Sequence, residues 1–481
     1  GGLVRIGAPG LTVERERVLV PLLLLGTAVF GALIGARPAL AVGAVSVAAV
    51  VALAFLFPVV HLTLLLLVTS VIPYDVQNAF GVGVGRSSAG LIFSDLLLLT
   101  GLARATLTLL RVPLRGRQLL SGAALITLLA VAALQAWRGH LGGVSLSLAG
   151  FEFRALLGWA TFLIAMPILL DPVGRRRLLN GLLVVGLVLG TWGLLQYFAR
   201  IPLVGGGSSG IRENVNFTQG AISVQGGLFG FPIAFVMGLA ALSSTEPQPF
   251  RTRIALLALV AFNGASLILT YERTFWVAAA LGFAFIVLKA GWSQRVRAVV
   301  LLAAAMLAAL PILSVVAPGS LAAAEQRLLS LGQYGNDDSV RTRVVETRAV
   351  VRKIREDPVV GSGIGDQVSY GYPWLRVPPE ATPYTHNGYL WIAWKLGVPA
   401  ALALLSMLAW ALVARAPPGV DPLTARVRDG AQAGLLIALV VSLTFPAFRA
   451  LAITTTLGVL LALALIGPAQ SAPTRHWTGR S

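Results

Sequence analysis

Charged residues and cysteine are scarce in this sequence. Only 12% of its 481 residues are charged, about half of the roughly 25% found in soluble globular proteins, whereas 57% are hydrophobic. So few charges cannot cover a water-soluble surface, and so apolar a chain cannot remain disordered. The absence of cysteine excludes disulfides, a thiol nucleophile and Cys-ligated metals. We therefore predict a protein whose bulk is embedded in lipid.

Negative charge is scarcer still, since 37 Lys and Arg stand against 19 Asp and Glu and give a formal net charge of +18. A nucleic-acid-binding protein would cluster its basic residues on one solvated face, with aromatic residues or a known reading module. Here they stand in small groups between apolar runs, the pattern of the positive-inside rule in polytopic membrane proteins. We therefore expect no nucleic-acid partner.

Apolar runs long enough to cross about 30 Å of hydrocarbon recur along the chain. We predict an all-α polytopic integral membrane protein with about twelve to fourteen transmembrane helices. The expected spans are 18–36, 39–57, 59–72, 91–110, 119–137, 155–170, 178–198, 219–242, 254–270, 274–289, 298–317, 387–414, 431–445 and 450–467. The 39–72 stretch, broken by Pro58 and His61, can be two short spans or a re-entrant pair.

The spans divide the chain into three expected regions: transmembrane helices over 1–317, a large loop over 318–386, and transmembrane helices with a short tail over 387–481. Basic residues gather in the connections that are cytoplasmic if the N-terminus is inside, and mostly stand singly in the others. This bias places both termini in the cytoplasm and the large loop outside. Long translocated segments are exempt from the charge rule, so the basic loop does not contradict this orientation.

The large loop carries helical patterns. We predict a short helix over 320–331 and a basic amphipathic helix over 339–356, with Asp338 or Ser339 as its N-cap. One side of the second helix carries Val340, Val344, Val351 and Ile354, and the other carries Arg341, Arg348, Arg352 and Arg355. Such a helix can dock on anionic lipid headgroups or roof a cavity for a polyanionic lipid-linked substrate, and both remain open.

A glycine-rich stretch follows the amphipathic helix. Asp357-Pro358 ends the helix, and the glycines of 361–365 predict a flexible turn. They do not predict a nucleotide loop, because they follow a helix instead of a strand and no Lys with Ser or Thr succeeds them.

Two arginines stand out among the outside connections. Arg273 lies in LTYERTFW between two apolar runs, where an arginine is costly and points to function unless it pairs with Glu272 and extends to the surface. Arg212 lies in the polar segment SSGIRENVNFTQG, where arginines are common and Glu213 offers a local partner. Either arginine alone has a structural explanation.

His386 lies where the large loop re-enters the membrane, in TPYTHNGYLWIAWKLG. A single histidine is more often structural than catalytic, but its position at this boundary makes it a candidate. Lys395 would lie on the same helix, two to three turns deeper. Arg343, on the amphipathic helix, cannot be distinguished from its basic neighbours by sequence.

Together these cations predict a pocket on the outer face that could bind a diphosphate, because the planar guanidinium pairs bidentately with phosphate oxygens. We expect no metal and no other cofactor. There is no His/Cys cluster and no Asp-x-Asp pair in an outside connection, and Asp337-Asp338 is better explained as a helix cap. Arginines would then supply the electrostatic stabilisation.

Along the large loop and the run after it, the sequence carries in order Thr342-Arg343, Asp357-Pro358, Gly361-x-Gly363-x-Gly365, His386-Asn387-x-x-Leu390 and Gly397. This series of motifs resembles the core signature of the O-antigen ligase and polymerase superfamily. Arg273 resembles the arginine of that family's Ser-Arg motif, although Glu272 stands where Ser is frequent, and Arg212 resembles its upstream periplasmic arginine. The layout, with one large loop before the last spans, also agrees.

The resemblance implies a bacterial inner-membrane enzyme with a C-type glycosyltransferase-like fold. Such an enzyme passes a glycan from undecaprenyl pyrophosphate to an acceptor hydroxyl on the periplasmic side, with inversion and without a metal ion. Carried onto this chain, Arg212 and Arg273 would bind the pyrophosphate, and His386 would be the general base or a further diphosphate ligand. We assign substrate binding to Arg343, Arg341, Asn387 and Lys395.

The acceptor remains open between a lipid A-core sugar, a growing glycan repeat and a protein Ser or Thr. We place the ligase first, on His386-Asn387-x-x-Leu390, and the protein acceptor third, because few polar residues follow the last span. A transporter or flippase of an anionic lipid-linked substrate would also use intramembrane arginines. It would usually show internal repeats, and the sequence shows none.

Overall fold

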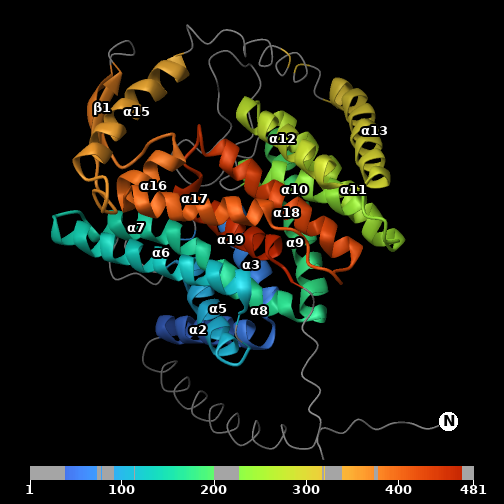
Figure 1. Cartoon of the computed structure of the whole chain (residues 1–481), viewed down its shortest axis with the longest axis horizontal. Helices are drawn as coiled ribbons and strands as arrows, with labels where there is room; N and C mark the ends of the chain where they lie inside the picture. The colour runs from blue at the N-terminus through green and yellow to red at the C-terminus, as the bar shows by residue number, and fades with distance from the viewer. Residues whose placement is uncertain are drawn as a thin grey trace, which may run out of the picture.

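The computed structural model describes residues 38–72, 92–112, 114–199, 227–316, 338–372 and 377–467, with the isolated residues 77, 319 and 325. Within these ranges the chain is a bundle of α-helices with one two-stranded hairpin (Figure 1). The prediction of an all-α polytopic membrane protein is confirmed. The predicted span 18–36, Arg212, and the predicted helix 320–331 apart from Glu325 lie outside the described residues.

The first half of the bundle is built from α2 (Pro38–Leu56), α3 (Pro58–Val71), α5 (Phe93–Leu109), α6 (Gly116–Leu141), α7 (Leu146–Leu157), the 3-10 turn η1 (Gly158–Ala160), α8 (Thr161–Leu170) and α9 (Pro172–Ala199). The second half continues with α10 (Gly227–Leu242), α11 (Phe250–Leu269), α12 (Arg273–Lys289), α13 (Trp292–Val316), α16 (Gly388–Leu396), α17 (Val398–Val413), α18 (Pro422–Val441), the 3-10 turn η5 (Ala447–Arg449) and α19 (Leu451–Ala464). Along the chain, α13 and α16 are separated by α15 (Asp338–Glu356), β1 (Val368–Tyr372) and β2 (Val377–Thr382).

Each predicted span from residue 39 onward coincides with one of these helices or with a pair of them. Four described helical stretches are long and apolar enough to cross a membrane: Gly116–Leu141, Leu146–Leu170, Pro172–Phe198 and Phe250–Leu269. The number of crossings, about twelve to fourteen, stays a prediction.

Two predicted runs are divided. The 39–72 stretch breaks at Phe57, because Pro58 takes the first position of α3. The 387–414 span breaks at Gly397, whose φ is 89°. A Cβ at this glycine would lie 2.1 Å from the carbonyl oxygen of Val359, so the approach of the loop requires a glycine there. The Val398 N–H donates to the Pro358 carbonyl at 2.8 Å and fixes this break.

The centre of the bundle is formed by α10 with α11 and α18, and by α19 with α8 and α18. Hydroxyls and small residues allow the helices to approach closely, as in other membrane proteins. The Thr161 hydroxyl donates to the Thr455 carbonyl at 2.7 Å, and a Cβ at Gly458 would lie 2.2 Å from Thr161 Oγ1. This close packing holds the α19 backbone in a fixed place beneath the site described below.

The predicted amphipathic helix is confirmed as α15, which packs against β1 and α16 (Figure 1). The hairpin was not expected from sequence. Its strands pair antiparallel, with Val368 opposite Thr382, although β2 contains Pro378 and Pro379. Prolines are tolerated here because each strand of a two-stranded sheet is an edge strand.

Candidate active site

His386 lies directly before α16, at the boundary that the sequence predicts. The Asn387 side chain caps the helix and accepts hydrogen bonds from two amides of its first turn, both at 3.0 Å. Its amide group donates to the Leu443 carbonyl at 3.3 Å, and the Gly388 N–H donates to the Ser442 carbonyl at 2.8 Å. Asn387 therefore uses both ends of its side chain to fix His386 against the end of α18.

Glu346 of α15 is the partner of His386, and the sequence analysis missed it. Its Oε2 lies 2.7 Å from His386 Nδ1 and accepts the His386 backbone N–H at 3.1 Å, while its Oε1 accepts the Tyr372 hydroxyl at 2.6 Å. Burial by itself raises the pKa of Glu346, but the hydrogen bonds from His386 and Tyr372 outweigh burial and lower that pKa. Burial and this carboxylate raise the pKa of Tyr372, so its hydroxyl remains a donor.

The contact with Glu346 decides which ring nitrogen of His386 carries the proton. An ionised carboxylate is only an acceptor, so Nδ1 must donate, and in the neutral ring Nε2 then carries the lone pair. Among the described residues nothing hydrogen-bonds to Nε2, and the side chain is 33% exposed. An oriented imidazole with an accessible acceptor nitrogen is what a general base requires.

The face that α15 presents to the protein differs from the predicted apolar stripe. Val344, one of the residues of that stripe, is 42% exposed, whereas Glu346 and Val350 are buried. The buried face of α15 is instead the one that carries Glu346, because Glu346 forms hydrogen bonds with His386 and Tyr372. A carboxylate in the middle of an otherwise basic helix was the signal that sequence reasoning could have used.

The structure places the two predicted loop arginines differently. Arg343 precedes Glu346 by three residues and shares its helix face. Its Nε is buried and has no hydrogen-bond partner within the described ranges. Arg341, in contrast, is exposed on α15. Arg343 is therefore the loop arginine on the side of His386.

Arg273 is the first residue of α12 and is half-buried. The next residue, Thr274, accepts a hydrogen bond from the Thr444 hydroxyl at 3.2 Å. Thr444 directly follows Leu443, whose carbonyl holds the cap of α16. The starts of α12 and α16 therefore meet at one end of α18, and Arg273 and His386 lie at the same end of the molecule.

Lys395 is fully buried in α16. Its Nζ lies 2.9 Å from Oε2 of Glu152, on α7, and donates to the backbone carbonyl of Asp366. The Gly365 N–H donates to the same Glu152 oxygen at 2.7 Å. The predicted substrate-binding lysine thus sits beneath the site and joins α16 to α7 and to the glycine turn.

Arg449 of η5 is a second cation beside Glu152, and the sequence analysis gave it no role at the site. Its Nε lies 3.5 Å from Glu152 Oε1. Its guanidinium carbon lies 5.5 Å from the centre of the Tyr384 ring, and that ring packs edge-on against His386 with centroids 4.9 Å apart. Arg449 and His386 therefore flank one aromatic ring.

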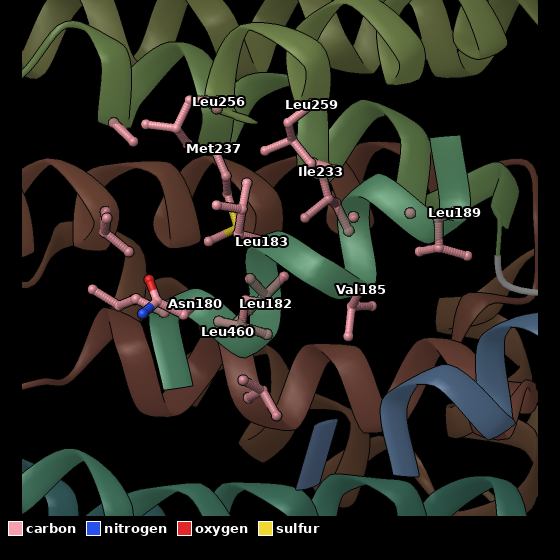
Figure 2. A pocket seen from close by; sticks show the side chains of 18 of the residues that line it. Asn180, Leu182, Leu183, Val185, Leu189, Ile233, Met237, Leu256, Leu259 and Leu460 are labelled. Carbon is pink, nitrogen blue, oxygen red and sulfur yellow. The ribbon is translucent and has the colours of Figure 1, made fainter. Parts of the chain in front are cut away.

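An apolar cavity lies within the bundle (Figure 2). It has a volume of about 150 Å³ and is lined mainly by leucines, valines and other apolar side chains of α9, α10, α11, α18 and α19. It touches α18 at Leu423 and Val427, whereas the end of α18 at Ser442 holds the loop of His386. Val427 and Leu423 lie roughly 22 Å and roughly 28 Å from Ser442 along the helix, and no residue that lines the cavity is one of the site residues described above.

The groups around the site also bear on metal binding. In the part of the chain that the structure describes, no three His, Asp or Glu side chains are grouped closely enough to hold a metal ion. That the enzyme works without a metal stays a prediction.

Comparison with known proteins gives one finding. Residues 255–405 match the O-antigen ligase family, which confirms the resemblance first seen in the motifs around Arg343 and His386. The matched segment contains Arg273 and Glu346 and ends before α18 and Arg449. No curated protein matches the chain significantly. The match indicates glycosyl transfer of the ligase or polymerase type in a membrane protein.

Proposed function

Starting from a segment that matches the O-antigen ligase family, we propose that this protein is an inner-membrane glycosyltransferase. It moves a glycan from undecaprenyl pyrophosphate to an acceptor hydroxyl on the periplasmic side, with inversion and without a metal ion. The lipid A-core is the acceptor that we place first, and a growing glycan repeat is second. The observation that carries the proposal is the pairing of His386 with the buried carboxylate of Glu346.

The proposed reaction begins with the acceptor hydroxyl hydrogen-bonded to Nε2 of His386. The hydroxyl oxygen attacks the first sugar's anomeric carbon while its proton moves to Nε2. The bond from that carbon to the diphosphate oxygen breaks on the opposite face, and its electron pair leaves with undecaprenyl pyrophosphate. Glu346 stabilises the imidazolium ion that forms, as a buried carboxylate does in catalytic triads.

The leaving diphosphate develops negative charge, and three features of this end of the bundle would stabilise it. Arg273 begins α12, and Arg343 lies on the face of α15 that carries Glu346. The N-termini of α12, α16 and α19 all lie near the end of α18, and helix N-termini favour anions. We add Arg212 as a further diphosphate ligand from the resemblance.

The test is transfer by the purified full-length protein in lipid nanodiscs, with a glycan on undecaprenyl pyrophosphate and separate candidate acceptors. We expect glycan on the lipid A-core and release of undecaprenyl pyrophosphate. His386→Ala is expected to lower the rate by roughly 10²- to 10⁴-fold, the range of general base catalysis. Arg273→Ala is expected to raise the KM for the glycan donor and lower the rate.

Arg348→Ala is the matched control, because Arg348 is exposed on the other side of α15 and should leave the rate unchanged. Glycan found only on further glycan, or only on protein, would replace the ligase by the polymerase or by the protein glycosyltransferase. Full activity of correctly folded His386→Ala and Arg273→Ala would show that the chemistry lies elsewhere. Movement of the lipid-linked glycan across the membrane without transfer would indicate a transporter.

A further inference from the structure

We propose that Arg449 is a further ligand for the diphosphate of the glycan donor, held beside His386 by the buried carboxylate of Glu152. The inference rests on the proposed function and deepens it, because it adds a cation that lies outside the segment matching the family. It assigns Glu152 and Lys395 as positioning residues, which act through Arg449 without touching substrate.

The position of Arg449 places its charge at the reacting end of the bundle. Arg449 ends η5, the short turn that connects α18 to α19, and η5 packs against α16 and α7. The Tyr384 ring contacts both groups, with its centre 5.5 Å from the Arg449 guanidinium carbon and 4.9 Å from the His386 imidazole centre. Arg449 and His386 are therefore neighbours of the same aromatic ring.

The distances of Arg449 and His386 from the Tyr384 ring are compatible with an inverting displacement. The base acts on the acceptor on one side of the anomeric carbon, and the leaving group departs on the other. In inverting glycosidases the two catalytic groups stand roughly 6.5–9.5 Å apart to leave room for the reacting atoms. Two contacts of 5.5 Å and 4.9 Å through the Tyr384 ring allow a spacing of this order.

The charges around Glu152 leave Arg449 incompletely neutralised. Glu152 is fully buried, and its Oε2 is occupied by Lys395 and by the Gly365 N–H. Its Oε1 faces the Arg449 Nε at 3.5 Å, and neither of these two atoms makes a hydrogen bond among the described residues. One carboxylate thus faces two cations.

Among the described residues, Arg449 forms an ion pair with Glu152 and not with Asp366, the other carboxylate beside Lys395. Asp366 accepts a hydrogen bond from the Trp394 indole N–H at 2.8 Å and lies 3.6 Å from Lys353 Nζ. Arg449 has a side chain only 19% exposed, and a cation so little exposed is costly without a full counter-charge. A bound anion would supply that charge.

The geometry of Arg449 fits a phosphate. Its guanidinium packs against the rings of Phe151 and Tyr384, each at 5.5 Å, which restricts its orientation. Glu152 approaches only Nε, and neither terminal nitrogen of Arg449 makes a hydrogen bond to a described residue. Two parallel N–H groups on a guanidinium of restricted motion are suited to bidentate contact with phosphate oxygens.

The experiment measures binding of farnesyl diphosphate and farnesyl monophosphate to the full chain in nanodiscs, beside the transfer assay. Arg449→Gln is expected to weaken diphosphate binding about tenfold or more, the loss of a charge-assisted contact, and to reduce the preference over monophosphate. The KM for the glycan donor should rise, with the KM for the acceptor unchanged. Arg348→Gln, on the exposed side of α15, should bind both probes as the wild type does.

A second variant keeps the test valid if Arg449→Gln fails to fold. Arg449→Lys keeps the charge beside Glu152 but loses the planar fork, so we expect a normal unfolding temperature and several-fold weaker diphosphate binding. Wild-type diphosphate affinity in the folded Arg449 variants would overturn the inference, even if transfer were slower. If the wild type transfers no glycan but binds diphosphate through Arg449, the proposed function fails while the diphosphate site stands.

Discussion

The Glu346 carboxylate acts on His386 through charge as well as position. It accepts two hydrogen bonds from His386, one from the ring and one from the backbone, and a third from Tyr372. Because burial alone would favour the neutral acid, these three donors are what keep Glu346 ionised. An ionised Glu346 orients the ring and stabilises the positive charge that His386 gains during the proposed transfer.

Replacing Glu346 by Gln removes the charge and keeps the shape. We expect the transfer rate to fall roughly 10- to 100-fold, within the range of acid–base contributions. Tyr372→Phe, which removes one hydrogen bond and no charge, should lower the rate only a few-fold. An unchanged rate for Glu346→Gln would remove Glu346 from the mechanism.

Glu346→Gln should also change how the stability of the fold depends on pH. The pKa of Glu346 is lower in the folded protein than the roughly 4.3 of an unfolded chain. Its ionised form therefore stabilises the fold above about pH 4.3, and this stabilisation is lost as the pH falls through the folded pKa. The unfolding temperature of the wild type should exceed that of Glu346→Gln at neutral pH, and the gap should close below about pH 4.

Residue-level prediction succeeded where a local pattern marks the residue. His386 was found because it stands between a polar loop and an apolar run, and Arg273 because it stands between two apolar runs. Glu346 and Arg449 were missed because their roles come from contacts distant in sequence. Lys395 lies on the helix that follows His386, as predicted, but only the structure shows its buried partner, Glu152.

Among the elements, the glycine turn between α15 and β1 is more fixed than the predicted flexible turn. Gly361, Gly363 and Gly365 all have positive φ, and Arg138 of α6 donates to the Gly361 carbonyl at 2.9 Å. A Cβ at Gly365 would lie 2.3 Å from Val144 Cγ1, so the turn is packed tightly against the start of α7. It thereby carries α15, and Glu346 with it, to a defined place over α16.

Gly365→Ala tests this coupling. The substitution adds both left-handed backbone strain, about 1–2 kcal/mol, and a clash with Val144. Gly143→Ala is a matched control, because Gly143 has a φ of 94° but open space around its Cβ position. We expect Gly365→Ala to lower the unfolding temperature more than Gly143→Ala, and only Gly365→Ala to slow transfer. Equal effects would show that the turn does not position the site.

Element prediction followed the strength of the periodic signal. The amphipathic α15 was located to within a few residues, and each described apolar run coincides with helix. Some of these helices extend beyond the predicted span, as α18 does by beginning at Pro422 instead of residue 431. The break at Gly397 and the hairpin of β1 and β2 were missed, since both depend on tertiary contacts. Gly397 breaks the span because Val359 packs against it.

The whole bundle has two chemically different ends. The end opposite His386 collects basic residues from several helices that lie far apart in sequence. There Lys289 lies 3.5 Å from Asp429, Arg426 donates to Ser243, and Arg297 donates to the Ser244 carbonyl. Since α12 and α18 each run from this cluster to the His386 end, the two groups of cations lie on opposite faces of the bundle.

Basic residues in short connections favour the cytoplasmic side, which agrees with the predicted orientation for the Lys289 end, and the long loop that carries α15 is exempt from this rule. The His386 end would then face the periplasm, where we place the transfer. The chain has no cysteine, so single cysteines report position without background. Val344, on α15, and Trp292, at the start of α13, are both well exposed and represent the two ends.

Val344→Cys should react with a membrane-impermeant thiol reagent applied from the periplasmic side, and Trp292→Cys should react only after the inner face is opened. Both labels are read by mass shift, with the cysteine-free parent as control and transfer activity as the check on folding. The predicted orientation requires Val344→Cys and Trp292→Cys to be labelled from opposite sides of the membrane. The reverse order would place α15 and His386 in the cytoplasm, where a glycan presented on the periplasmic side could not reach them.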